Sequence, residues 1–251
     1  MAFEGQSGLP PVTRVIVASG VVATVVPAAA ATPAPVYQLS LGDSLAAGTG
    51  ASTPADSYVN LVASHEESRF PGLEVKNRAC GGATTNSMID AADPANAHFP
   101  NFPTGTPLGA AETFLRSNPG RVPYVTIDIG GNNVDGCLTS GTVSASCVAH
   151  GLALVSSQLP QIVAGLEQAA PAVPIFGMDY YDPFLADTGG PALARASATL
   201  VFELNSLLTQ VYGANGAVPV DVQGPFAFGH AVFDGSLIGA SGSSPIVAVE
   251  G

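Results

Sequence analysis

The chain has 251 residues, of which 47% are hydrophobic and only 10% are charged. This composition excludes intrinsic disorder and collagen-like structure, and the length fits one large domain. Seven basic and nineteen acidic residues give a formal net charge of −12, which disfavours binding to nucleic acid or to anionic lipid surfaces because both are negatively charged.

The first 31 residues have the pattern of a signal peptide. An apolar stretch over residues 15–31 follows Arg14, is interrupted at Pro27 and ends in four alanines that suit a cleavage site. A transmembrane anchor is the alternative, but Pro27 leaves only about a dozen unbroken apolar residues and a span needs about 20. We therefore expect residues 1–31 to be a cleaved signal peptide, residues 32–251 to form the mature domain, and the protein to be secreted with no stable membrane span.

Strands and helices alternate along the rest of the chain. Runs rich in β-branched residues predict strands over residues 36–41, 73–79, 124–129, 173–178 and 218–222. Apolar residues at three- and four-residue spacing predict helices over residues 57–68, 109–117, 148–169 and 191–213. Alternation with mostly unbroken apolar strands indicates a parallel sheet covered on both faces. The sequence thus predicts an α/β fold: a three-layer α/β/α, flavodoxin-like, doubly wound sheet of about five parallel strands.

Unusual segments follow the first three predicted strands. They are G-D-S-L at 42–45, a loop around Gly82, and G-G-N-N at 130–133. Ligands bind outside the carboxyl ends of parallel strands, so we expect these segments to face one crevice. There Ser44 is a candidate nucleophile, and the Ser44 N–H, the Gly82 N–H and the Asn132 amide are candidate oxyanion donors for acyl transfer. A helix-capping serine without chemistry is the alternative for Ser44.

These segments resemble the blocks of SGNH, or GDSL, hydrolases, whose members share a serine, a glycine, an asparagine and a histidine. The resemblance runs from about residue 36 to residue 230, and within it residues 124–129 and 178–184 look like those of secreted actinobacterial esterases and lipases. Asn133 stands where many members carry aspartate. It implies a secreted ester hydrolase without metal or organic cofactor, acting on a small-molecule, lipid or sugar ester. We expect the protein to be a monomer. In the implied mechanism, Ser44 forms an acyl-serine and a histidine acts as base and then as acid.

The family's last block, Asp-x-x-His, is not found in the sequence. His230 is the only histidine in the corresponding region, so it is the candidate base, with Asp234 to orient it; a loop histidine without chemistry is the alternative. We therefore expect a C-terminally incomplete domain. The alternative function is a catalytically impaired or truncated protein of this fold that binds an acylated or glycan ligand without turnover. A flavodoxin-like cofactor domain is disfavoured, because no phosphate-binding glycine motif is present.

The other candidate residues have supporting roles. We expect Asp43 to hydrogen-bond the local backbone, Asn77 to hold the second block, and Asn133 to organise the third through its amide. Tyr180, Tyr181 and Asp182 follow the fourth strand and either line the pocket or pack beneath it. His65, His98 and His150 are expected at the surface.

Export makes a disulfide between Cys137 and Cys147 expected, since these residues flank a short Thr/Ser/Gly-rich loop and disulfides persist in oxidising compartments. Cys80 is then left without a partner, and we expect it to be buried or reactive. No Cys/His spacing indicates a zinc site.

Overall fold

The computed structural model describes residues 17–18, 21–22, 34–100, 102, 105–139, 142–182 and 191–225. The chain divides into two units, Met1–Ala34 and Pro35–Gly251. In the first unit, β1 (Val17–Ala18) pairs antiparallel with β2 (Val21–Val22). The signal-peptide boundary at residue 31 and the single mature domain stay predictions.

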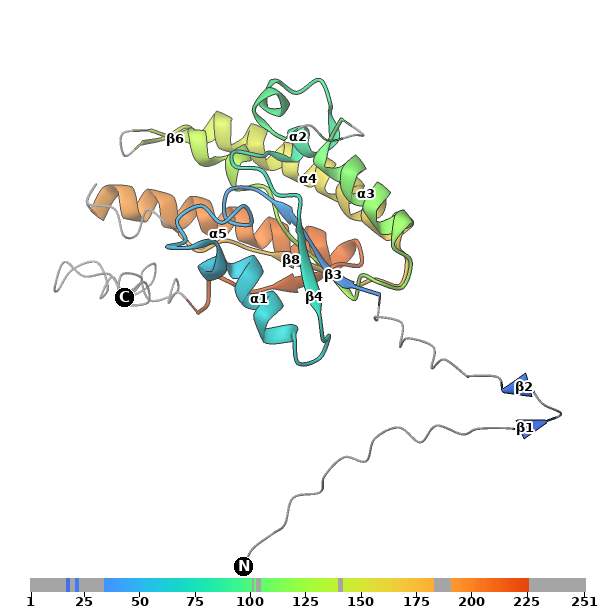
Figure 1. The fold of residues 1–251 in the computed structure, drawn as a ribbon. Helices are drawn as coiled ribbons and strands as arrows, with labels where there is room; N and C mark the ends of the chain where they lie inside the picture. The colour runs from blue at the N-terminus through green and yellow to red at the C-terminus, as the bar shows by residue number, and fades with distance from the viewer. Residues whose placement is uncertain are drawn as a thin grey trace, which may run out of the picture. The chain divides into compact units, whose positions relative to one another are not determined.

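The second unit is built on a five-stranded parallel sheet with the order β4-β3-β5-β8-β9 (Figure 1). The strands are β3 (Val36–Gly42), β4 (Leu73–Asn77), β5 (Tyr124–Asp128), β8 (Ile175–Met178) and β9 (Val218–Val220). All five predicted strands are confirmed. β4 ends two residues earlier than predicted because the Asn77 side chain accepts the Ala79 N–H at 2.9 Å and turns the chain.

Helices cover both faces of this sheet. The α-helices are α1 (Tyr58–Glu66), α2 (Thr85–Ile89), α3 (Pro107–Ser117), α4 (Ala145–Ala169) and α5 (Pro191–Ala214). In Figure 1, α1 lies in front of the sheet, and α3, α4 and α5 lie behind it. The predicted three-layer α/β/α fold and its four helices are confirmed. α2 was not predicted, because five residues are too few to show an apolar period.

Short elements fill the connections. The 3-10 helices are Pro54–Asp56, Pro94–His98, Gly131–Asn133 and Asp135–Cys137. A small antiparallel pair, β6 (Leu138–Thr139) and β7 (Thr142–Val143), precedes α4. The third of the 3-10 helices follows β5 directly and carries Asn132.

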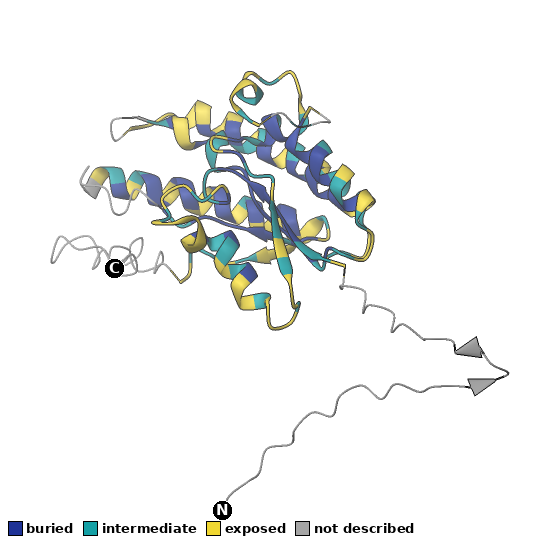
Figure 2. Ribbon diagram, viewed as in Figure 1, coloured by how far each residue is buried: buried dark blue, intermediate teal, exposed yellow. Residues whose placement is uncertain are grey.

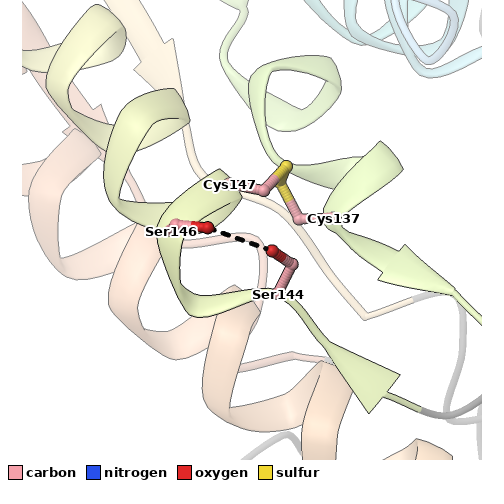
Figure 3. Close-up of a disulfide and its surroundings, with 4 residues drawn as sticks. All are labelled: Cys137, Ser144, Ser146 and Cys147. Atoms are coloured by element: carbon pink, nitrogen blue, oxygen red, sulfur yellow. Dashed lines mark hydrogen bonds between the residues drawn. A yellow bond between two sulfur atoms is a disulfide. The ribbon is translucent and has the colours of Figure 1, made fainter.

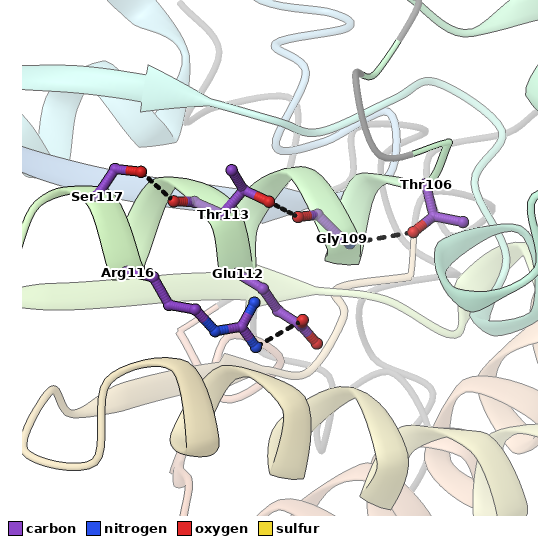
Figure 4. Close-up of polar contacts among 6 residues, drawn as sticks. All are labelled: Thr106, Gly109, Glu112, Thr113, Arg116 and Ser117. Atoms are coloured by element: carbon purple, nitrogen blue, oxygen red, sulfur yellow. Dashed lines mark hydrogen bonds and ion pairs between the residues drawn. The ribbon is translucent and has the colours of Figure 1, made fainter.

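α3 illustrates how local sequence sets a helix. The Thr106 hydroxyl caps the helix by accepting the Gly109 N–H at 3.0 Å, and Arg116 pairs with Glu112 one turn away at 2.9 Å (Figure 4). An exposed pair of this kind contributes only about 0.3–0.5 kcal/mol. The buried face of α3, which includes Leu115, therefore determines where the helix packs.

The core lies between the sheet and the layer formed by α3, α4 and α5 (Figure 2). α4 is the one helix in the described part of the chain that is long and apolar enough to cross a membrane. Its residues Val155, Leu159 and Ile162 are fully buried in the core cluster. We therefore interpret α4 as a core helix, which satisfies the same length and composition criteria as a span.

Cys137 and Cys147 form a disulfide with their Cα atoms 5.5 Å apart (Figure 3). The bond joins the end of a 3-10 helix to the first turn of α4 and encloses the β6–β7 pair. Cys80 is the free cysteine and is buried, and burial raises the pKa of its thiol to about 11. This places it among inert structural cysteines rather than reactive ones.

Candidate active site

The candidate site lies where the strand order reverses. Numbered along the chain, the five strands have the order 2-1-3-4-5, so the switch point falls between β3 and β5. Gly42 at the end of β3 pairs with Asp128 at the end of β5. The two strands lead respectively into the turn that carries Ser44 and the 3-10 helix that carries Asn132. Both residues line one pocket of about 350 Å³.

Gly82 is held between these two segments. The Cys80 N–H donates to the Gly42 carbonyl at 3.0 Å, and the Ala83 carbonyl accepts from the Asn132 Nδ2 at 3.0 Å. Gly82 has a φ of +81°, in the left-handed region, and a Cβ at this position would meet nothing within 4 Å. The conformation of the loop, rather than lack of space, therefore requires glycine. Gly82 itself is exposed and is not part of the pocket lining.

Polar contacts fix the turn that carries Ser44. The Leu45 N–H donates to Asp43 Oδ1 at 3.0 Å, and the Tyr180 hydroxyl donates to Asp43 Oδ2 at 2.7 Å. Burial raises the pKa of Asp43, while these two hydrogen bonds lower it. The Asn77 amide donates to the Ala46 carbonyl at 2.6 Å. The structure thus gives Asp43 and Asn77 the supporting contacts expected of them.

Asn133 ties the third segment to α2. Its Oδ1 accepts the Thr85 N–H at 3.0 Å, and its Nδ2 donates to the Thr85 hydroxyl at 2.8 Å. That hydroxyl in turn donates to Gln158 Oε1 on α4 at 2.6 Å. An aspartate at position 133 would compete for the hydroxyl proton, because a carboxylate only accepts. The asparagine therefore suits the polar chain that joins this loop to α4.

The pocket has a polar edge and an apolar wall. Tyr180 and Tyr181 line it after β8, whereas Asp182 is buried outside the lining. The remaining apolar lining residues come from the Ser44 turn, the third segment and α5; they are Leu45, Val134, Leu200, Val201 and Leu204. Such a pocket accepts an apolar group beside a hydroxyl and an amide.

The structure does not place the catalytic base. His230 and Asp234 lie outside the described residues. The three described histidines, His65, His98 and His150, are exposed, and none of them lines the pocket. Within the described ranges, no three His, Cys, Asp or Glu side chains come together in a way that would hold a metal ion.

Sequence reasoning missed three contributions to the site. The bond from Tyr180 to Asp43 joins residues 137 positions apart, and no local pattern indicates it. The α5 wall is the second, because the apolar spacing of residues 191–213 predicts a helix and does not show which strand ends that helix reaches. Asp128 did leave a signal, because it is the one ionisable carboxyl in a short segment of uncharged residues.

Comparison with known proteins finds a matching family model and solved structures with a similar fold. A model described as GDSL-like Lipase/Acylhydrolase family matches residues 40–237. The chain is similar to an extracellular lipase from Streptomyces rimosus, with a TM-score of 0.53 and 20% identity over 76% of this chain and 82% of that chain. It is also similar to phospholipase A1 from Streptomyces albidoflavus, with a TM-score of 0.51 and 20% identity over 77% of this chain and 82% of that chain. The chain is similar as well to a lipase from a goat rumen metagenome, with a TM-score of 0.51 and 17% identity over 76% of this chain and 82% of that chain.

At these identities the likeness to solved structures shows a shared fold. No curated protein sequence matches the chain.

Proposed function

The chain belongs to the GDSL-like lipase/acylhydrolase family, whose members are carboxylic ester hydrolases, and we propose that it cleaves its ester through an acyl intermediate on Ser44. The observation that carries this proposal is the placement of Ser44 and Asn132 in one pocket at the switch point of the sheet. Secretion is also proposed. It rests on the signal-peptide pattern of residues 1–31 and on the extracellular lipase to which the fold is similar.

The three candidate donors are available to an oxyanion. Neither the Ser44 N–H nor the Gly82 N–H donates a hydrogen bond to any part of the chain that the structure describes. The Asn132 amide has two N–H groups, and one hydrogen bond to Ala83 leaves the second for a ligand. Loss of one such donor raises the barrier of acyl transfer by about 2.7–4 kcal/mol.

The proposed reaction has two half-reactions. Ser44 Oγ attacks the ester carbonyl carbon and gives its proton to the base, while the carbonyl electron pair moves to the oxygen held by the three donors. The alcohol then leaves with the proton from the base, and the acyl group remains on Ser44. Water repeats the sequence, releases the acid and restores the serine. His230 is our candidate for the base.

The apolar wall supports an acyl group as its occupant. The α5 residues Leu200, Val201 and Leu204 line the same pocket as Ser44 and Asn132. Burying methylene groups against them is favourable by about 0.8 kcal/mol each. We therefore propose that the acyl chain of the substrate lies along α5, and that the alcohol lies toward the exposed edge near Thr49 and Asp135.

The test is hydrolysis of p-nitrophenyl butyrate by the wild type and by Ser44→Ala. Ser68→Ala, an exposed serine outside the pocket, is the matched control. The proposal expects activity in the wild type and in Ser68→Ala, and background rates in Ser44→Ala. Equal background rates in all three proteins would instead support the alternative, a protein that keeps the pocket without turnover.

A further inference from the structure

Asp128 lies against the turn that carries Ser44, although it is not part of the pocket lining. Its carbonyl accepts the Asp43 N–H at 3.1 Å, and its Oδ2 accepts the Ala46 N–H at 3.0 Å. Its carboxyl also fills the space beside Gly42, where a Cβ would overlap it. Asp128 therefore contacts the chain on both sides of Ser44.

The surroundings of this carboxyl contain acids and phenols. Asp43 interacts with it from the turn, Tyr58 from α1 and Tyr212 from α5. Tyr180 interacts with both carboxyls from the end of β8. The ion pairs formed by the described residues involve none of these groups. Both carboxyls are 2% exposed, and two buried neighbouring carboxyls without a cation do not both ionise.

Hydrogen bonding decides which carboxyl keeps the proton. Asp43 receives one hydrogen bond on each oxygen, from Leu45 and Tyr180. Asp128 Oδ1 and the Tyr58 hydroxyl are both fully buried, and neither makes a hydrogen bond of good geometry with another described residue. The two side chains nevertheless interact with each other. Burial and then the charge of Asp43 raise the pKa of Asp128 well above its usual range, against backbone hydrogen bonds that lower it. This arrangement favours the proton on Asp128 over the proton on Asp43.

We propose that Asp128 is a positioning residue for ester hydrolysis, and that it holds the Ser44 turn in place as a neutral carboxylic acid. As an acid it keeps the bond from Ala46 and can donate its proton toward Tyr58. As an anion it would add a second buried negative charge behind the site where the oxyanion forms, which opposes the reaction. The positioning role rests on the proposed function, whereas the protonation of Asp128 does not.

The first experiment reads the proton directly. Infrared difference spectra of wild type against Asp128→Asn at neutral pH are expected to contain the C=O band of a protonated carboxyl that the variant lacks. Tyr58→Phe is expected to shift that band, which keeps the test decisive if Asp128→Asn does not fold. A spectrum without the band, or a band that persists in Asp128→Asn, overturns the proposal.

The second experiment separates a neutral acid from a carboxylate and from a purely structural residue. In the wild type, kcat is expected to decline at alkaline pH because Asp128 ionises. Asp128→Asn is expected to keep kcat close to the wild-type value at neutral pH and to show no such decline at alkaline pH. Asp128→Ala is expected to lower kcat on the order of 100-fold with little change in KM, because the turn is misplaced. Equal losses in both variants, or kcat and pH profiles unchanged in both, overturn the proposal.

The two experiments also distinguish this inference from the proposed function. In one outcome, the wild type hydrolyses esters no faster than Ser44→Ala but shows the protonated-carboxyl band. The proposed function and the positioning role are then wrong, while the protonation of Asp128 is confirmed. If hydrolysis depends on Ser44 and the band is absent, the proposed function stands and the inference about Asp128 is wrong.

Discussion

The hydrogen bond from Tyr180 to Asp43 makes a quantitative prediction about the Ser44 turn. The bond is 2.7 Å long, and the two side chains are 7% and 2% exposed. A hydrogen bond to a charged group contributes about 1.5–3 kcal/mol. We infer that Asp43 is the anion at neutral pH, and we therefore expect Tyr180→Phe to lower the free energy of unfolding there by about 2 kcal/mol.

The effect depends on pH in a direction that the surroundings of Asp43 determine. Burial, the largest influence, raises the pKa of Asp43 in the folded protein above its unfolded value, and the bond from Tyr180 lowers it. The contribution of Asp43 to stability therefore falls as pH rises from the unfolded pKa through the folded one. Removing the Tyr180 hydroxyl raises the folded pKa further and makes this fall larger. The loss caused by Tyr180→Phe is thus smaller in acid than at neutral pH.

Urea unfolding of wild type and variants at acidic and neutral pH measures this difference. Tyr124→Phe is the matched control, because the Tyr124 hydroxyl donates at the same 2.7 Å to the neutral Gln38 Oε1 and Tyr124 is 6% exposed. A neutral bond contributes about 1 kcal/mol, and its loss is expected to be similar at both pH values. A loss in Tyr180→Phe that does not exceed that in Tyr124→Phe, or that is equal at both pH values, would refute the reasoning.

Three further predictions concern the oxyanion donor, the acyl wall and the disulfide. Asn132→Ala is expected to lower kcat for p-nitrophenyl butyrate by about 10²–10³-fold with a native circular dichroism spectrum; an unchanged kcat would remove Asn132 from the site. Leu204→Trp is expected to lower the ratio of kcat/KM for octanoate over acetate esters on the order of tenfold, and an unchanged ratio would show that the acyl chain does not lie along α5. Replacing Cys137 and Cys147 together by serine is expected to lower the free energy of unfolding by about 2–3 kcal/mol, and unfolding curves that superimpose would contradict this.

Much of the fold could be predicted because its information is local. The segments 39–41 and 125–127 each have two apolar residues around one small hydroxyl residue, and each leads into a glycine-rich turn. This local pattern indicates a buried parallel strand. The positions of Ser44 and Asn132 follow from the same pattern, because each stands directly after a strand that the topology brings to the switch point.

The rest depends on contacts between distant parts of the chain. Leu204 lines the pocket because of how α5 is oriented over the strand ends. The spacing of apolar residues along α5 does not predict that orientation. The protonation of Asp128 depends on the proximity of Asp43, which is 85 positions away, and on the burial of both carboxyls. Asn133 likewise takes its role from Thr85 and from the bond that Thr85 makes to α4.

The central claim is that Ser44 carries the acyl group. Its most direct test is reaction of the protein with a fluorophosphonate ester, which traps an activated serine, followed by peptide mass analysis. The account predicts one phosphonate adduct, located on Ser44 and absent from Ser44→Ala. An adduct on another residue of the wild type, or none while the protein still hydrolyses p-nitrophenyl butyrate, would contradict it.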